Sequence, residues 1–406
     1  MRAWPTVPSH LAWLDRHLNS LLAFGRSTPA PGGGAYWLDD DGTPLPAQGV
    51  QTWITCRTVH VYSLGTLLGI PGSRPIAEAA LAGLTGPLRD TENGGWYPGV
   101  GADGTPDPDK TAYAHAFVVL AASSATVAGL AGARELLTDA LATYERWFWD
   151  EAAGKAVDTW DTTFSTLDPY RGINANMHTV EAFLAAADVT GDRVWLDRAA
   201  RIGAFAASAA AANGWRLPEH FDEAWTAQPE FNDDQRDDKF KPYGATVGHG
   251  LEWARLLLHL EAAGATGADW LEAARALFDR AVADGWAADG ADGFVYTTDW
   301  SGVPVVADRM HWVAAEAIGA AAALHQRTGD EQYAQRYAQW WDYVDRYVID
   351  HVNGSWFHQL DVHNQPAGTV WPGKADLYHA AQCTLIPRLP LAPSLATAVA
   401  QGLVRS

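Results

Sequence analysis

The 406-residue chain is poor in sulfur and in positive charge, and it lacks long apolar runs. Its two cysteines, Cys56 and Cys383, are expected to be buried free thiols of a cytoplasmic protein. The 28 basic residues are outnumbered by 48 acidic ones, and the net charge of -20 argues against binding to nucleic acid or to anionic membranes. No stretch approaches the roughly 18 apolar residues of a membrane span, and the first residues show no signal-peptide pattern.

Apolar and aromatic residues are plentiful. Hydrophobic residues make up 48% of the chain and charged residues 19%, so it can bury a large core. The 20 tryptophans are unusually many. Most are expected in the core, but flat aromatic faces are also what sugar rings pack against.

Two series of glycines recur about every sixty residues. The first series begins segments of aromatic and polar residues, at Gly34, Gly95, Gly154, Gly214, Gly293 and Gly354. Alternation and turn residues in these segments predict short β-hairpins or extended loops. The second series separates pairs of helical patterns, as expected of glycines that end a helix before a tight turn, at Gly72, Gly132, Gly191, Gly267 and Gly329. A sixth turn, near Pro390, uses prolines instead.

These repeats predict an all-α fold. Each of six units contains a hairpin, a helix, a short turn and a second helix. Six units are few for an open solenoid and the terminal units lack a polar cap, which favours closure into an (α/α)6 barrel with short β-hairpin loops at one end. We expect one catalytic domain over residues 1–406. Residues 222–245 enlarge the fourth repeat, are rich in charge without helical periodicity, and are predicted to form a long loop near the site.

The first helix of each unit begins with unusually polar residues. Six of the 14 histidines lie in these starts: His60, His115, His178, His249, His311 and His379. In a closed barrel the first helices form the inner ring, so their starts converge at one end of the central cavity. His249 and Glu252, three residues apart where an apolar helix begins, are predicted to belong to a shared site. For His60, His115 and His311, a role as core histidines bonded to the backbone is equally open.

The motifs limit the chemistry. The sequence has no HExxH, no cysteine cluster, no carboxylates at ligand spacing, no glycine-rich phosphate loop and no GxSxG, so we expect no tight metal site. Imidazoles beside carboxylates suit proton transfer near neutral pH. Aromatic walls with arginine, asparagine and lysine suit a neutral polyol.

The chain resembles the N-acylglucosamine 2-epimerase superfamily in five segments: RTVHVYSLG, NANMHTVEAF, KPYGATVGHGLEW, RMHWVAAEAIGA and GKADLYHA. The resemblance runs from about Trp53 to Gln382, and within the superfamily it is strongest to the branch of D-mannose isomerases and sulfoquinovose isomerase. It implies an (α/α)6 barrel without a cofactor. It also implies aldose–ketose isomerisation of a monosaccharide, D-mannose to D-fructose, with D-lyxose and D-xylulose as a further pair.

The resemblance further implies roles for individual residues. His379 is the base that moves a proton between C2 and C1. His249, oriented by Glu252, handles ring opening and the protons on oxygen, and Arg57 stabilises charge on the enediolate. The residues implied to bind the substrate are Trp53, Tyr113, Asn174, His178, Lys239, Trp312, Glu316, Trp371 and Asp376.

Other functions stay open from the sequence. Two histidines on opposite faces of the sugar would allow 2-epimerisation, and Lys239 or Lys241 beside an anionic group would suit sulfoquinovose. A glycoside hydrolase needs two carboxylates about 5 to 10 Å apart, with Asp103, Asp109 and Asp376 as candidates. A sugar-binding protein without catalysis would not need the imidazoles. We expect a monomer or weak homo-oligomer without nucleic-acid or membrane partners.

Overall fold

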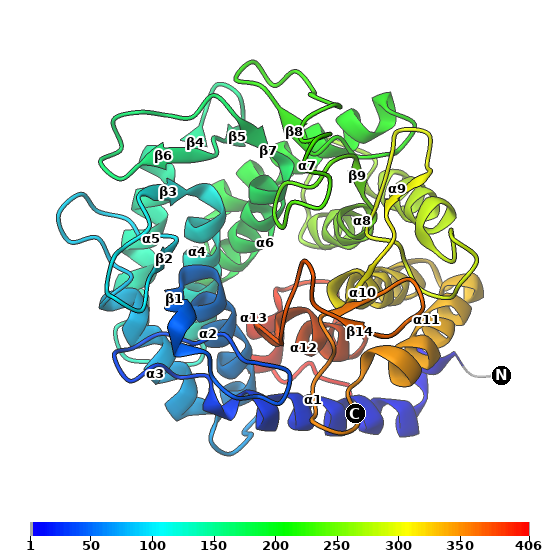
Figure 1. The fold of residues 1–406 in the computed structure, drawn as a ribbon, viewed down its shortest axis with the longest axis horizontal. Helices are drawn as coiled ribbons and strands as arrows, with labels where there is room; N and C mark the ends of the chain where they lie inside the picture. Colours follow the sequence, from blue (N-terminus) through cyan, green and yellow to red (C-terminus); the bar gives the residue numbers. More distant parts are fainter. Residues whose placement is uncertain (1–2, 406) are drawn as a thin grey trace.

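The computed structural model describes residues 3–405, whose long helices form two concentric rings (Figure 1). The inner ring consists of α2 (Thr52–Leu67), α4 (Ala112–Val127), α6 (Ile173–Thr190), α8 (Val247–Ala262), α10 (His311–Thr328) and α12 (Tyr378–Leu385). The outer ring consists of α3 (Ser73–Thr85), α5 (Ala133–Trp147), α7 (Arg193–Ala212), α9 (Trp270–Gly285), α11 (Glu331–Tyr343) and α1 (Pro8–Phe24). Each inner helix packs against the next, and α12 returns to α2, so the predicted (α/α)6 barrel is confirmed.

The two rings differ in how their helices are buried. In α2 every residue from Thr52 to Gly65 is buried. In the outer helix α5 the buried residues follow helical spacing: Ala133, Leu136, Leu137, Ala140, Leu141 and Tyr144. A helix enclosed on all sides needs no polar face, whereas a surface helix does. A polar residue on an inner helix is therefore buried, and its direction around the helix decides whether it reaches the barrel axis.

The second series of glycines lies between antiparallel helices, as predicted. Gly191 and Gly329 end α6 and α10 in the left-handed region, with φ of 72° and 70°. In three other units an earlier glycine with positive φ follows the first helix: Gly69, Gly129 and Gly264. The predicted glycines of those units lie further along the turn, and two of them, Gly72 and Gly132, directly precede the second helix.

The sixth unit differs from the prediction. The sequence predicts a second helix after the proline turn near Pro390, but the outer partner of α12 is α1, from the other end of the chain. The C-terminal helix α13 (Leu395–Ala400) packs instead against the inner helices α2, α4 and α6. In Figure 1 it lies inside the outer ring. The N-terminal helix thus completes the outer ring, and the C-terminal segment closes the inside of the barrel.

Short strands precede the inner helices and join neighbouring units, which confirms the predicted strand-bearing end. The strand before an inner helix pairs antiparallel with one from the following unit. These pairs are β1 (Val50–Gln51) with β2 (Gly99–Val100), β3 (Asp109–Thr111) with β6 (Thr159–Asp161), β7 (Arg171–Gly172) with β8 (His220–Phe221), β9 (Ala245–Thr246) with β10 (Thr297–Thr298), and β12 (Arg309–Met310) with β13 (Gln359–Leu360). At the sixth junction the Lys374 N–H donates to the Leu38 carbonyl over 2.9 Å.

The remaining strands are local additions. β11 (Pro304–Val306) and β14 (Pro366–Ala367) extend two of the pairs, and β4 (Trp149–Asp150) pairs with β5 (Lys155–Ala156). Short 3₁₀ helices lie at Trp4–Thr6, Gly25–Ser27, Pro46–Gln48 and Ile386–Arg388, and a π-helical turn at Val344–Val348.

Two expectations from composition can be compared with the structure. Cys56 and Cys383 are both buried and free, as predicted. Over residues 3–405 no helix has both the length and the apolar character needed to cross a membrane.

Candidate active site

The residues of the candidate site share one register on the inner helices. The second residues of these helices are Trp53, Tyr113, Asn174, Gly248, Trp312 and His379. One turn later, the sixth residues are Arg57, Phe117, His178, Glu252, Glu316 and Cys383. Positions four apart lie on the same side of a helix. Most of these side chains line a cavity of about 550 Å³, which also contains His249.

His379 is held by a chain of buried charges. Its Nδ1 lies 2.8 Å from Glu316 Oε1, and Glu316 Oε2 accepts from Arg255 Nε at 2.9 Å. Burial raises the pKa of Glu316, but the charge of Arg255 and the hydrogen bond from His379 outweigh burial and hold it at about 2. The ionised carboxylate can only accept, so His379 carries its hydrogen on Nδ1 and keeps a lone pair on Nε2.

The electrostatics of His379 favour the neutral ring. Burial lowers the pKa of His379 because it disfavours the imidazolium, and the hydrogen bond to Glu316 offsets part of this effect. A neutral imidazole with one nitrogen fixed by a carboxylate is a base ready to accept a proton.

His249 has a similar arrangement with a different partner from the one predicted. Its Nδ1 lies 2.9 Å from Oε2 of Glu219, a buried residue directly before β8. The sequence predicts Glu252 as the orienting group, but Glu252 Oε1 accepts from Arg255 at 3.4 Å. His249 is the third residue of α8, roughly 100° around the helix from the second position. It contacts Glu219 of the segment before β8 rather than Glu252.

Glu252 lines the cavity in surroundings that favour its protonated form. Burial raises its pKa well above the ordinary range, and the negative charge of Glu316 raises it further. A protonated carboxyl can donate a hydrogen bond, which an ionised one cannot. The raised pKa of Glu252 therefore favours a role as a donor to a substrate oxygen.

The fold also assembles groups that the sequence spacing does not reveal. Ligand-type atoms of Glu252 lie within 4.8 Å of His178 and Glu181 in one group, and of Glu316 and His379 in another. A divalent ion could be held by such a set. Arg255 already forms an ion pair with Glu316. The absence of a metal stays a prediction, which chelation tests.

Arg57 is a fixed positive charge in the cavity wall. It donates to Asp376 Oδ2 at 3.0 Å and to the Tyr113 hydroxyl at 3.2 Å, and its guanidinium lies 4.9 Å from the Trp53 ring. Burial lowers the pKa of Arg57, but Tyr113 and Asp376 raise it above its ordinary value. Among residues 3–405, neither the buried Arg57 Nε nor the buried Asn174 Oδ1 has a hydrogen-bond partner.

The loop at 222–245 reaches across the cavity from the fourth unit. Lys239 Nζ lies 4.0 Å from the Trp37 ring and 4.3 Å from the Trp371 ring. The Phe240 ring packs 5.6 Å from Trp371 and 5.9 Å from Tyr113. Burial lowers the pKa of Lys239 to about 8. Lys239 and Phe240 thus join the fourth unit to the first and sixth units.

The structure brings most of the predicted residues together. Those that line the cavity are His379, His249, Glu252, Arg57, Tyr113, Asn174, His178, Lys239, Trp312, Trp371 and Asp376. Two predicted substrate-binding residues do not line it. Glu316 contacts His379 and Trp53 contacts Arg57, so each supports a wall residue instead.

Three site residues that sequence reasoning missed occupy one repeated position. Glu219, Tyr296 and His358 directly precede β8, β10 and β13. Tyr296 and His358 line the cavity, and Glu219 binds His249. A polar residue about three to five positions after the glycine of each of these glycine–aromatic segments was the available signal.

Two of the six histidines at the helix starts lie outside the cavity wall. His115 Nδ1 contacts the Thr111 carbonyl at 2.8 Å, and its Nε2 accepts from the Trp96 N–H at 3.1 Å. His60 Nδ1 contacts Ser124 Oγ at 2.7 Å, deeper in the barrel. The helix starts thus bring His178, His249, His311 and His379 to the cavity, whereas His60 and His115 lie in the core, the alternative that the sequence left open for them.

Two basic residues at the helix starts are structural clamps. Lys110 Nζ donates to Asp90 at 2.8 Å and to a carbonyl of the same turn at 3.0 Å. Lys374 Nζ repeats this with Asp350 at 2.7 Å and a carbonyl at 2.8 Å. Both lysines have fully buried side chains. They fix the segments that lead into α4 and α12.

Known proteins match the part of the chain that contains these site residues. The family model of N-acylglucosamine 2-epimerase (GlcNAc 2-epimerase) matches residues 33–383. D-mannose isomerase from Thermobifida fusca is 54% identical over 404 residues, covering 98% of this chain and 99% of the relative. D-mannose isomerase from Pseudomonas cannabina pv. alisalensis is 45% identical over 404 residues, covering 98% and 97%.

A solved structure gives the same result in three dimensions. A crystal structure of D-mannose isomerase matches with a TM-score of 0.88 at 27% identity, covering 94% of this chain and 99% of that one. The family match includes both His249 and His379. With its barrel closed around these residues, the chain belongs to the N-acylglucosamine 2-epimerase family.

Proposed function

We propose that the chain is an aldose–ketose isomerase that interconverts D-mannose and D-fructose through a cis-enediol. The observation that carries the proposal is His379, whose Nδ1 is fixed by Glu316 and whose ring lines the cavity with the cation Arg57. The D-mannose isomerases that are 54% and 45% identical to the chain support this substrate.

A single base is sufficient for the carbon chemistry. His379 Nε2 removes the proton from C2 as the C1–C2 double bond of the enediol forms, and it returns that proton to C1 as the carbonyl forms at C2. One oxygen-bound proton moves from the C2 hydroxyl to the C1 oxygen, so the reaction is balanced without an oxidant. Arg57 stabilises the negative charge that develops on these oxygens.

The other histidine serves the oxygen atoms. His249, oriented by Glu219, transfers protons during ring opening and between O1 and O2. The protonated carboxyl of Glu252 donates to a sugar oxygen in the same cavity. The Trp312 ring packs 5.2 Å from His249 and 5.8 Å from His379, which places an apolar wall between the two imidazoles.

The mouth of the cavity favours a monosaccharide. Lys239 and Phe240 both line it and pack against Trp371. A second sugar ring extending through the mouth would have to displace these contacts. A single hexose would lie beneath them.

A second candidate, 2-epimerisation, is favoured by the matched pairs His379–Glu316 and His249–Glu219. Two such bases on opposite faces of the sugar would remove a C2 proton on one side and replace it on the other. The isomerase proposal has stronger support, because the D-mannose isomerases that are 54% and 45% identical cover nearly the whole chain.

The glycoside hydrolase alternative finds less support. Asp103 and Asp109 are exposed and are not among the residues that line the cavity. Asp376 does line it, but its oxygens accept from Arg57 and from the Tyr378 N–H. A hydrolase needs a carboxylate pair free to act on the glycosidic bond.

The test is direct product analysis. Enzyme treated exhaustively with EDTA should convert D-mannose to D-fructose, followed by NMR, with D-lyxose and sulfoquinovose assayed in parallel. Faster turnover of sulfoquinovose would replace the substrate assignment. Absence of any ketose, or activity that returns only with a divalent ion, would overturn the proposal.

A further inference from the structure

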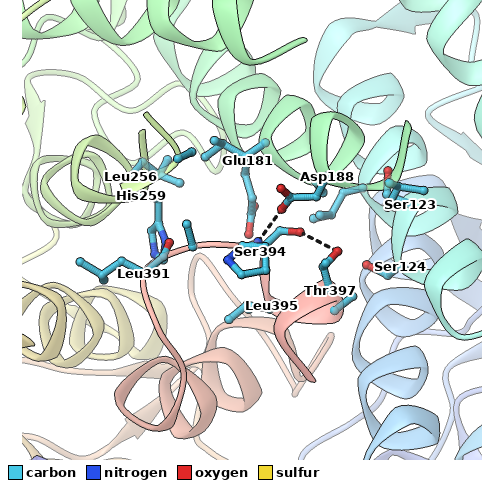
Figure 2. A pocket seen from close by; sticks show the side chains of 18 of the residues that line it. Ser123, Ser124, Glu181, Asp188, Leu256, His259, Leu391, Ser394, Leu395 and Thr397 are labelled. Atoms are coloured by element: carbon cyan, nitrogen blue, oxygen red, sulfur yellow. Dashed lines mark hydrogen bonds between the residues drawn. The ribbon is translucent and has the colours of Figure 1, made fainter. Parts of the chain in front are cut away.

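Two cavities lie along the inner helices. The deeper one, of about 620 Å³, is bounded on one side by residues 391–397 (Figure 2). There the Ser394 N–H donates to Asp188 and the Ser394 hydroxyl donates to Thr397, as the dashed lines of Figure 2 show. The other cavity, that of the candidate active site, contains His311 and His358, two histidines without a role in the proposed proton transfers.

Strand pairing between the fifth and sixth units places these two histidines opposite each other. In the antiparallel pair of β12 and β13, Met310 lies opposite Gln359. The next pair in this register is His311, the first residue of α10, and His358, the residue before β13. Side chains opposite each other on antiparallel strands are close enough for direct contact. The two rings are accordingly stacked, with centroids 3.8 Å apart and planes inclined by 12°.

His358 is fixed by the backbone at both ring nitrogens. Its Nδ1 accepts from the Ala375 N–H at 3.3 Å, and its Nε2 lies 3.2 Å from the Asp376 carbonyl. A carbonyl can only accept, so the hydrogen is on Nε2 and the ring is neutral. Because neither nitrogen is left for a sugar, His358 serves as a platform on which His311 stacks.

His311 is fixed at only one ring nitrogen. Its Nδ1 lies 3.2 Å from the His358 carbonyl, which also accepts from the His311 backbone N–H at 3.0 Å. The hydrogen is therefore on Nδ1, and Nε2 keeps a lone pair. Over residues 3–405, Nε2 has no hydrogen-bond partner and yet is not sealed off by burial. Since the ring lines the candidate active site, this lone pair is open to the cavity.

The surroundings of the stack favour neutral rings. Burial lowers the pKa of His311 well below its ordinary value, and the neighbouring His358 lowers it further. Burial also lowers the pKa of His358 to about 4. A proton on either ring would place a buried cation against its stacked neighbour. In the favoured neutral form, His311 Nε2 accepts hydrogen bonds and does not donate them.

We propose that His311 is a specificity-determining residue that accepts a hydrogen bond from one hydroxyl at C3, C4 or C6 of the sugar. The inference rests on the proposed function, which places the reacting carbons C1 and C2 at His379. The His311 ring lies 6.3 Å from the His379 ring, with planes inclined by 82°. A hexose whose C2 contacts His379 can extend a hydroxyl of its non-reacting part to His311 Nε2.

An acceptor of this kind discriminates between sugars by what they lack. A site built to bind a hydroxyl rejects an analogue without it, because a polar group of the site is then left unpaired. Fluorine resembles a hydroxyl in size but cannot donate a hydrogen bond. A deoxyfluoro sugar should therefore be as poor a substrate as the deoxy sugar at the recognised position.

The test measures kcat/KM by NMR for D-mannose, for its 3-, 4- and 6-deoxy analogues and for the matching deoxyfluoro sugars. His311→Phe keeps a stacked ring but removes the acceptor. It should lower kcat/KM for D-mannose about tenfold or more, and this loss should disappear for the one deoxy analogue that lacks the recognised hydroxyl. The matched control His325→Phe changes a half-buried histidine near the other end of α10 and should leave the pattern of the wild type.

The outcomes separate this inference from the proposed function. Equal losses in His311→Phe for D-mannose and all three deoxy analogues would overturn the role of His311. If that variant does not fold, the wild type decides: turnover restored by fluorine in the poorest deoxy analogue, or equal turnover of all analogues, would contradict an acceptor at this position. A wild type that forms no fructose from D-mannose would instead contradict the proposed function.

Discussion

The starts of α4 and α12 carry the same sequence signature and have different roles. In each, a clamped lysine is followed five residues later by a histidine, Lys110 by His115 and Lys374 by His379. However, His115 is the fourth residue of α4 and His379 is the second residue of α12. Two residues turn a side chain by roughly 200° around a helix. His379 consequently lines the cavity, whereas His115 accepts from the buried Trp96 N–H.

This difference shows that helical register, rather than residue type or spacing from a clamp, selects the site residues. At the second position of α4 stands Tyr113, which lines the cavity as His379 does. The same position supplies Asn174 and Trp312 from α6 and α10. On α4, α6, α10 and α12, the residue at the second position of the helix therefore reaches the cavity.

The largest expected effect is on stability and comes from the clamps that the two regions share. Lys110→Met and Lys374→Met each leave a buried carboxylate, Asp90 or Asp350, without its partner, which typically costs about 3–5 kcal/mol. Urea unfolding should show similar losses for both variants. Only Lys374→Met should also lower kcat of the folded fraction, because Lys374 fixes the approach to His379. Equal loss of turnover in both would show that the two starts are not functionally distinct.

The next effect separates the two histidines. His379→Ala should lower kcat at least about 10², the scale expected for a general base. His115→Ala should instead destabilise the fold by about 1–3 kcal/mol, because the Trp96 N–H loses its acceptor. Turnover is measured per folded enzyme, with circular dichroism to establish folding. A comparable fall in kcat for His115→Ala would contradict the register account.

The carboxylates behind the histidines should have smaller effects. Glu316→Gln and Glu219→Gln keep an acceptor for Nδ1 but remove its charge, so each should lower kcat about 10- to 100-fold, by analogy with groups that orient functional histidines. Glu252→Gln should be milder, because burial favours the neutral form of Glu252 and glutamine is also neutral. Steady-state kinetics will rank the three variants. A larger loss for Glu252→Gln than for Glu219→Gln would restore Glu252 as the partner of His249.

Much of the fold could be predicted because its signals are local and repeated. The turn glycines and the apolar helical patterns recur with one period, and short-range chemistry fixes both. The outer partner of α12 could not be found this way. That partner, α1, has an ordinary amphipathic pattern of leucines at 11, 14, 18 and 21, but it lies at the opposite end of the chain.

The site was predictable to the extent that residue type and helical position agree. His379, His249 and Arg57 could be recognised from the sequence, because they are polar residues in the otherwise apolar starts of the inner helices. Glu219, the partner of His249, could not be recognised in this way, since strand pairing between units brings it to His249. Sequence spacing of three residues favoured Glu252 for that contact, although the ring of His249 points elsewhere.

The smallest expected effect is a displacement in the pH profile. His379 acts as a base only when neutral, and burial lowers its pKa below the ordinary 6.5. The acidic limb of kcat/KM should therefore lie below pH 6.5, with activity retained as the pH falls through that value. Glu316→Gln removes the charge that raises this pKa and should move the limb lower still. A limb at or above pH 6.5, or an upward displacement in Glu316→Gln, would exclude His379 as the titrating base.

The most direct test of the central claim, that His379 alone handles the carbon-bound proton, uses [2-²H]mannose. NMR follows the early products of the wild-type enzyme before equilibrium is reached. A single base that carries the proton from C2 to C1 predicts fructose as the main early product, with the retained label at C1. Glucose that appears from the outset at a rate equal to or above that of fructose, with solvent hydrogen at C2, would contradict the claim and make His249 a second carbon base.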